Sequence, residues 1–134
     1  MEDRYLFKAK RLDNGEWVQG YLYGILEKKY ILWGMTNDIP NMIEVDPTTI
    51  CQCTGLKDKN GKLIWENDIA SYSDLITGDK KIICIEWNKM QASFVRKYRS
   101  PMGLQYIYID KYIASRMEII GNIFDNPELL ESEG

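Results

Sequence analysis

One of the side-chain types that most often carry out chemistry in proteins is missing from this chain. The sequence contains no His, which removes Ser-His-Asp and Cys-His nucleophilic sites together with metal-activated hydrolysis on His ligands. It contains neither a GxxxxGK[ST] phosphate loop nor a GxGxxG dinucleotide loop. We therefore expect no catalytic residues, no cofactor and no enzymatic activity.

One pair of carboxylates has a spacing that could serve chemistry. Glu66 and Asp68 lie two residues apart in an expected turn, where two acids can share a hard cation or a proton. No Lys, His or Ser stands directly beside them, and acids in turns commonly bond nearby backbone amides. We favour this structural interpretation, and an enzyme that uses Glu66 and Asp68 is the last of our functional hypotheses.

The three cysteines are Cys51, Cys53 and Cys84, and a structural zinc site normally needs four ligands. If residues 51–53 belong to a strand, the first two thiols point to the same face and can both lie in the core. We expect free, buried thiols and no metal. The charged start of the chain is unlike a signal peptide, and no stretch approaches the roughly 18 apolar residues of a membrane span, so we expect a cytoplasmic protein.

The net charge of −3 is unevenly placed, because the last ten residues carry four acids and no Lys or Arg. The rest of the chain therefore sums to +1 (−3 plus 4), without the basic face typical of nucleic-acid binding or the polybasic segment that binds membranes. The best candidate for a nucleic-acid surface interleaves three cations with two aromatic residues on a probable strand: Phe94, Arg96, Lys97, Tyr98 and Arg99. We favour the alternative of an edge strand that its charges keep soluble.

The N-terminal half is expected to form hairpins. Two Asn-Gly pairs, Asn14-Gly15 and Asn60-Gly61, lie between β-branched or aromatic runs and predict type I′ turns. Residues 16–25 alternate, which places Trp17, Tyr21 and Tyr23 on one face and two glycines on the other, where a bulge or another backbone is expected. Lys28-Lys29 predicts a turn, and residues 34–48 predict the longest loop of this half.

The C-terminal half is expected to form a small curled sheet or an SH3-like barrel. Strand-like runs occupy residues 62–124 with no convincing helix among them. The pair Asn126-Pro127 predicts a short helix in the acidic tail. The fold class is mainly β in one domain, 1–134, with 1–50 as a β-hairpin region, 51–124 as a barrel-like region and 125–134 as the tail.

Two long motifs carry a resemblance to a known family. Residues 52–69 read QCTGLKDKNGKLIWENDI and residues 118–130 read EIIGNIFDNPELL. With the segments at 7–11 and 15–22, they resemble the YopX family of phage and prophage proteins over the whole chain, with Asn67 where the family usually has Gly. The resemblance implies a mainly β protein of a phage or prophage, in a bacterial host cell, and the family has no established biochemical function.

Two functional hypotheses follow. The favoured one is a non-enzymatic interaction module that self-associates or binds an unknown phage or host protein, because Tyr and Trp are enriched at interfaces. Its candidate contact residues are aromatic or leucine side chains expected at the surface: Trp17, Tyr21, Tyr23, Leu129 and Leu130. The leucine pair can dock on its own domain or on a neighbouring copy. The alternative is an accessory protein that binds nucleic acid during phage growth.

Overall fold

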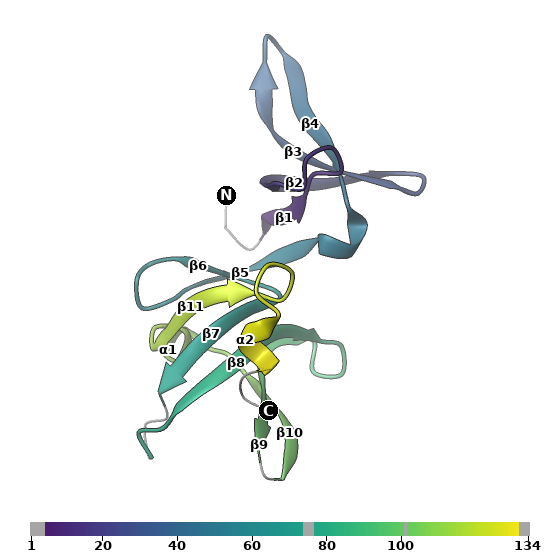
Figure 1. The fold of residues 1–134 in the computed structure, drawn as a ribbon. Helices are drawn as coiled ribbons and strands as arrows, with labels where there is room; N and C mark the ends of the chain where they lie inside the picture. Colours follow the sequence, from purple (N-terminus) through teal and green to yellow (C-terminus); the bar gives the residue numbers. More distant parts are fainter. Residues whose placement is uncertain (1–4, 74–76, 101, 132–134) are drawn as a thin grey trace. The chain divides into compact units, whose positions relative to one another are not determined.

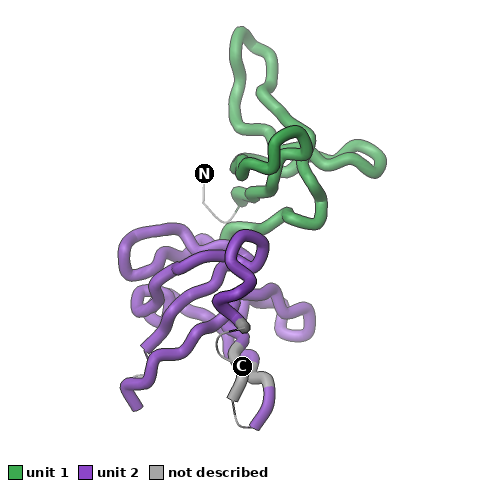
Figure 2. Tube along the Cα trace, in the orientation of Figure 1, with its two compact units in different colours: residues 1–53 green, residues 54–134 purple. Residues whose placement is uncertain are grey.

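The computed structural model describes residues 5–73, 77–100 and 102–131, with the side chains of residues 98–100, 104, 105 and 131 left out. The chain forms two compact units, residues 1–53 and 54–134 (Figure 2). Antiparallel strands dominate both, so the prediction of a mainly β fold is confirmed. The chain passes from unit 1 to unit 2 inside strand β5 (Cys51–Lys57).

Unit 1 is a sheet of strands in the order β4-β3-β2-β1-β5 (Figure 1). Its strands are β1 (Phe7–Lys10), β2 (Trp17–Ile25), β3 (Lys28–Thr36) and β4 (Ile39–Val45), followed by the 3-10 helix η2 (Pro47–Thr49). Strand β2 pairs with β1 through its first four residues and with β3 through its last five. The change of partner occurs at Gly20, where an added Cβ would lie 2.2 Å from the carbonyl oxygen of Leu32. The expected close approach of another backbone is confirmed at this glycine.

The core of unit 1 is small. Ala9, Ile31 and Val45 are completely buried, and four half-buried residues pack around them: Phe7, Val18, Ile43 and Ile50. The register places Ile31 opposite Ile43, so both point to the core side of the β3–β4 pair.

The prediction of a long loop over residues 34–48 is wrong, because β3 and β4 form a hairpin there. Asn37 and Asp38 connect the strands with φ of 52° and 64°, the left-handed region that these two residue types tolerate well. Pro40 lies on β4, which is an edge strand, where its missing N–H costs no ladder hydrogen bond. The expected turn at Lys28-Lys29 is also displaced, since both residues belong to β3 and Leu26 takes the positive φ of 57°.

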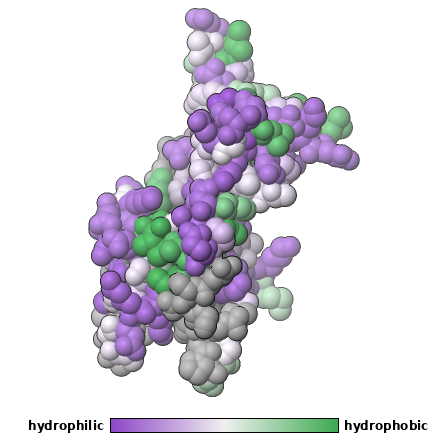
Figure 3. Space-filling view, viewed as in Figure 1, coloured by the Kyte–Doolittle hydropathy of each residue, from purple (hydrophilic) through white to green (hydrophobic). Residues whose placement is uncertain are grey.

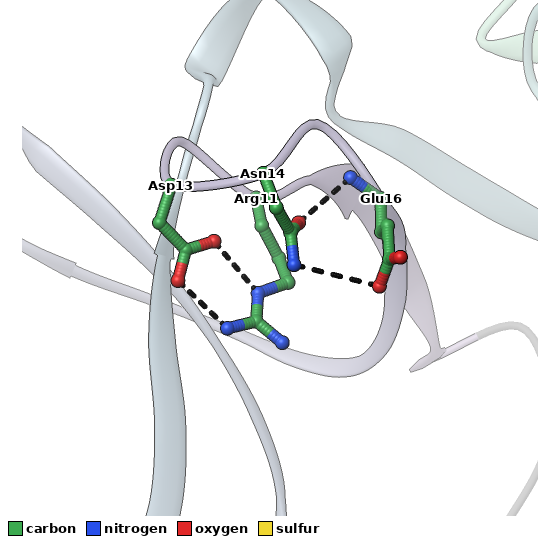
Figure 4. A network of polar contacts seen from close by, with 4 residues as sticks. All are labelled: Arg11, Asp13, Asn14 and Glu16. Carbon is green, nitrogen blue, oxygen red and sulfur yellow. Dashed lines mark hydrogen bonds and ion pairs between the residues drawn. The ribbon is translucent and has the colours of Figure 1, made fainter.

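Both Asn-Gly hairpins are confirmed, but neither turn is of type I′. Only the glycines, Gly15 and Gly61, have positive φ, at 73° and 79°. In the second turn the N–H of Gly61 donates to the carbonyl of Asp58, and Gly61 then serves as a left-handed bulge residue. In the first turn (Figure 4), the Asn14 side-chain oxygen accepts from the Glu16 N–H at 2.9 Å.

The first turn also carries an exposed ion pair. Arg11 donates twice to the Asp13 carboxylate, at 2.9 and 2.7 Å (Figure 4). The hydrogen bond from Arg11 lowers the pKa of Asp13, and the same bond raises the pKa of Arg11. Pairing of this kind at the surface orders the turn and adds little to stability.

Unit 2 contains the rest of β5, β6 (Leu63–Trp65) and an open five-stranded sheet in the order β10-β9-β8-β7-β11. That sheet is formed by β7 (Asp68–Ser73), β8 (Lys80–Asn88), β9 (Ser93–Ser100), β10 (Gly103–Tyr108) and β11 (Met117–Asn122). Because β10 and β11 are separate edges of this sheet, the barrel alternative of the prediction is wrong. The short helix predicted in the tail is confirmed as α2 (Glu128–Glu131).

The core of unit 2 lies on one face of this sheet. Seven residues are buried there, and half-buried residues of the β5–β6 hairpin, β11 and the segment around helix α1 (Lys111–Ala114) pack against them. The seven come from β6, β7, β8, α1 and β11: Ile64, Ala70, Tyr72, Ile83, Ile85, Ala114 and Met117. Helix α1 was not predicted, and its single turn is capped by the Asp110 side chain, which accepts from the Ile113 N–H at 2.8 Å.

Three apolar residues of the two family-like motifs differ in burial. Leu56 packs against the unit 2 core and Trp65 is buried, whereas Ile120 is 37% exposed. Ile120 lies at a register shift between Ile119 and Gly121, and such a bulge turns one extra residue out of the ladder.

Among the described residues, no helix is both long enough and apolar enough to cross a membrane.

Candidate functional site

The candidate self-association residues Tyr21 and Tyr23 lie on the face of the unit 1 sheet that points away from its core. Residues directly opposite each other in antiparallel strands share a face, so the register defines the whole set. Tyr21 is opposite Leu32 and Tyr23 is opposite Tyr30, while Leu32 is in turn opposite Met42. We call this set the outer face, formed by Tyr21, Tyr23, Ile25, Lys28, Tyr30, Leu32, Met42 and Glu44.

The outer face is largely apolar and open to solvent. Tyr23 is 47% exposed and Ile25 is 45% exposed, and Tyr21 and Met42 are each 38% exposed. Apolar residues also reach the surface at the tips of the β2–β3 and β3–β4 hairpins, where Leu26, Met35 and Ile39 are exposed (Figure 3). Exposed apolar residues are normal when scattered, but a contiguous group on one face is typical of a contact surface.

Trp17, the third aromatic residue of the prediction, has a different environment. The ammonium groups of Lys8 and Lys10 lie over its ring, 4.8 and 5.5 Å from the centroid. Lys10 is directly opposite Trp17 in the ladder between β1 and β2, so all three side chains share one face. Because these cation–π contacts cover the Trp17 ring with side chains of unit 1, the ring is less available to a partner molecule than the rings of Tyr21 and Tyr23.

The leucine pair of the tail lies in helix α2, which packs against β8 in the same unit. Leu129 is half-buried and Leu130 is 37% exposed. Of the two alternatives for this pair, the contact present is with its own unit.

The candidate nucleic-acid residues are divided between the two faces of β9. Phe94 and Arg96 lie on the face that carries the unit 2 core, opposite Trp87 and Ile85. Lys97 points to the other face, where its Nζ lies 3.1 Å from Glu86 Oε1. The side chains of Tyr98 and Arg99 lie outside the described residues. Alternation along the strand thus separates the cations that the sequence pattern had grouped.

Arg96 is directed inward rather than toward solvent. Its guanidinium lies over the Tyr72 ring, 5.0 Å from the centroid. Its Nε and Nη1 atoms are buried and have no hydrogen-bond partner among the described residues. The hydrogen bond to Glu86 raises the pKa of Lys97. Neither cation is arranged as a free phosphate contact.

An open groove in unit 2 lies beside Phe94. Its volume is about 490 Å³, and its lining is apolar with polar groups at the margin: Thr54, Leu56, Gln91, Ser93, Phe94, Tyr108 and Ile109. Trp87 holds the Phe94 ring in an edge-to-face contact at 5.0 Å between centroids. No charged residue lines this groove, so the phosphates of a nucleic acid would find no partner there.

The carboxylates and thiols considered above have structural surroundings. Asp68 is buried and accepts from the Trp65 N–H at 2.8 Å. All three cysteines are free and buried, and burial raises the pKa of the Cys84 thiol to about 12. Within the described ranges, no group of three metal-ligating side chains comes together.

Six of the eight members of the outer face were not named as candidates by the sequence, and three of them fell in expected connections. Met42 and Glu44 fell in the expected loop, and Lys28 fell in the expected turn. The alternation of apolar and polar residues over 39–45 is weak, because Pro40 and Asn41 interrupt it. The stronger signal was Asn37-Asp38, a pair suited to a two-residue hairpin turn.

Comparison with known proteins agrees with the resemblance stated above. The model of the family described as "YopX protein" matches residues 6–131, nearly the whole chain. The chain belongs to the YopX family. No match was found among curated proteins.

Solved structures similar to this YopX protein include the crystal structure of protein EF1440 from Enterococcus faecalis, with 20% sequence identity and a TM-score of 0.47. The similarity covers 92% of this chain and 96% of that chain. A likeness at this level says nothing about function.

The central YopX motif has a structural centre at Asp58. This carboxylate is buried and accepts from the backbone N–H groups of Asn60, Lys62 and Ile119, at 2.9, 2.9 and 3.0 Å. Burial opposes the charged form, but the three hydrogen bonds together prevail and lower the pKa of Asp58. Asp58 therefore joins the β5–β6 turn to β11.

The two YopX motifs also meet through the backbone. The Lys59 N–H donates to the Met117 carbonyl at 2.9 Å, and the Ile123 N–H donates to the Asn67 carbonyl at 3.1 Å. Asn67 has a φ of 72°, which confirms that Asn can replace the family's glycine here. At Gly121 an added Cβ would lie 2.5 Å from Asn126 Oδ1. The motif residues thus have clear structural roles in unit 2, whereas the outer face belongs to unit 1.

Proposed function

We propose that this YopX protein is a non-enzymatic interaction module that self-associates through the outer face. One observation carries the proposal: in a three-stranded segment of unit 1, Ile31 and Val45 are buried on the inner face, while an aromatic and aliphatic outer face lies in solvent. Burying apolar surface is the main favourable term in most protein association. Tyrosine also adds a hydroxyl that can be solvated at the rim of a contact.

The proposal is tested by the mass of the protein in solution. A single chain is 15.7 kDa, and we expect size exclusion with light scattering to give a larger mass at high protein concentration. The Tyr23→Glu substitution places a charge in the outer face and is expected to shift the mass to that of one chain. Circular dichroism of the variant should match the wild type, because Tyr23 is half exposed.

The matched control is Tyr112→Glu. Tyr112 is 79% exposed on helix α1 of unit 2, so the same change there should leave association unaltered. A wild-type protein that stays at the mass of one chain at every concentration would remove the proposal.

We also propose, from family membership, a phage or prophage role in the cytoplasm of the bacterial host. An unknown phage or host protein remains the further partner. A tagged copy recovered from induced cells, followed by fractionation and identification of co-purifying proteins, tests both. Recovery of the tagged copy in the membrane fraction would contradict the proposed location.

A further inference from the structure

The outer face carries one residue of each charge. Lys28 is opposite Ile25 at the β2–β3 end, and Glu44 is opposite Tyr30 on β4. No ion pair joins these two side chains to each other in the part of the chain that the structure describes. Each charge therefore lies beside apolar neighbours and is not neutralised by the other.

The positions of the two charges are related by the ladder register. Tyr23 and Tyr30 form a row across β2 and β3, and Glu44 extends that row onto β4. Lys28 lies one row away, toward the β2–β3 turn, and Met42 with Leu32 lies one row away on the other side. The aromatic pair thus lies near the middle of a patch with Lys28 and Ile25 on one side and Leu32 and Met42 on the other.

We infer that the partner of this face is a second copy of the chain, packed outer face to outer face about a two-fold axis. This axis lies oblique to the strands and passes near Tyr23 and Tyr30 and between Lys28 and Glu44. This inference rests on the proposed function. In that arrangement Lys28 of each copy lies over Glu44 of the other, and Ile25 lies over the Leu32–Met42 end. A two-fold contact is self-complementary, so a single asymmetric pair of charges is satisfied twice.

The dimensions suit this packing. Sheets stack face to face about 10 Å apart, a gap that a Lys and a Glu side chain can span together. Eight side chains that are partly exposed can contribute on the order of 600 Å² per copy, near the lower end of the roughly 600–1,000 Å² per partner in stable complexes. The neighbouring exposed hairpin tips would enlarge the contact.

The face suits a second copy better than a strongly charged partner. The two charges of the outer face cancel, and the lysines that continue this side of the sheet on β1, Lys8 and Lys10, hold their ammonium groups over the Trp17 ring. A two-fold axis through both Lys28 and Glu44 would place Lys28 against Lys28 and Glu44 against Glu44. Because like charges would then meet, that orientation of the two copies is disfavoured. The two charges therefore select one relative orientation of the two copies.

Charge reversal tests this geometry. Lys28→Glu and Glu44→Lys each place two like-charge pairs in the symmetric dimer, and each is expected to weaken dimerisation at least tenfold by sedimentation equilibrium. Mixing the two single variants should restore association as a one-to-one heterodimer, because each copy then supplies the sign that the other lacks. The double variant Lys28→Glu/Glu44→Lys should dimerise like the wild type.

The control is Lys80→Glu, a reversal of an exposed lysine at the start of β8 in unit 2, which should change nothing. If Glu44→Lys does not fold, Lys28→Glu/Glu44→Gln takes its place and should associate better than Lys28→Glu alone. A wild-type protein that associates while both reversals and their mixture behave alike would overturn the two-fold geometry and leave self-association standing. A monomeric wild type would overturn both.

Discussion

The two units use their apolar residues in different ways. The buried cluster of unit 2 has seven residues, whereas the buried cluster of unit 1 has three. Yet unit 1 exposes large apolar side chains in every one of its long strands, among them Tyr23 in β2, Trp33 in β3 and Ile39 in β4. A small unit gains little stability from a small core, so apolar residues placed on its outer face reduce what its fold can bury. The smaller core and the open outer face of unit 1 support the proposal that this unit makes contacts with other molecules.

The units also differ in how their hairpins are held. In unit 2 the β5–β6 turn is fixed to a distant strand by Asp58, whose partner Ile119 is 61 residues away. In unit 1 the Asn14 side chain bonds within the β1–β2 turn, to Glu16, and the link to a distant strand is made by the backbone, from the Leu12 N–H to the Glu44 carbonyl at 3.2 Å. Unit 2 thus fixes its turn through a buried carboxylate, whereas unit 1 fixes its turn through the backbone.

The largest expected effect comes from shortening one core residue in each unit. Ile31 and Ile83 are both fully buried, and Ile→Ala at such sites costs about 2–5 kcal/mol. In unit 1 this loss removes the largest of three core residues, so Ile31→Ala should unfold residues 1–53 selectively. Ile83→Ala should lower the stability of unit 2 while leaving it folded at 25 °C.

Hydrogen exchange read by mass spectrometry checks this pair. Peptides from residues 1–53 should lose protection in Ile31→Ala, with peptides from residues 54–134 unchanged. Loss of protection over the whole chain at once in Ile31→Ala would contradict the independent stability of the two units. That result would instead support the prediction of one domain over 1–134.

Much of unit 2 could be predicted from the sequence because its signals are local. Asn60-Gly61 marks a turn, Asp58 has a side chain suited to bonding that turn, and Asn126-Pro127 marks a helix start. The burial of Cys51 and Cys53 followed from alternation alone. The closed barrel failed because closure depends on whether two distant edge strands meet, and no local pattern encodes that.

The outer face could be predicted only in part. Alternation along β2 identified Tyr21 and Tyr23, and Gly20 indicated the close approach of a second backbone. Lys28 and Glu44 were missed because their place depends on the register across three strands. Pro40 suggested a loop, since proline interrupts most strands, but an edge strand accepts it.

A smaller effect is expected at Asp58, the buried carboxylate that links the β5–β6 turn of unit 2 to β11. In Asp58→Asn one carboxylate oxygen becomes an NH₂ group, so one of the three backbone donors that bond Asp58 meets another donor. Leaving a buried N–H without an acceptor costs about 1–3 kcal/mol. Urea unfolding at pH 7, followed by tryptophan fluorescence, should show this loss.

The pH dependence of wild-type stability gives a second test of the role of the Asp58 carboxylate. The folded-state pKa of Asp58 is lowered, so its stabilising effect is fully present above its unfolded value of 3.8 and is lost as the pH falls through the folded pKa. Asp58→Asn should therefore flatten the acid side of the stability curve. The exposed Asp13→Asn in the unit 1 turn serves as control and should leave the free energy of unfolding almost unchanged. Equal losses at both positions would remove the distinction between the hairpins.

The smallest effect is expected at Arg96, whose buried Nε and Nη1 atoms have no hydrogen-bond partner among the described residues. The cation–π contact with Tyr72 contributes about 0.5–2 kcal/mol, and two buried donors without partners cost a similar amount. Methionine keeps an unbranched apolar stem against the ring and removes the donors. Arg96→Met should thus leave the free energy of unfolding within about 1 kcal/mol of the wild type or raise it.

The neighbouring Lys97→Met is the matched comparison, since it breaks a half-exposed ion pair with Glu86 and should cost about 0.2–1 kcal/mol. A loss above 2 kcal/mol in Arg96→Met would show that ordered water satisfies the buried guanidinium in solution. The same two variants address the nucleic-acid hypothesis. If β9 contacts phosphates, both weaken binding of single-stranded DNA at low salt while their stabilities stay near that of the wild type. Because Arg96 is turned to the core side and Lys97 is bound to Glu86, we expect the wild type not to bind single-stranded DNA through β9.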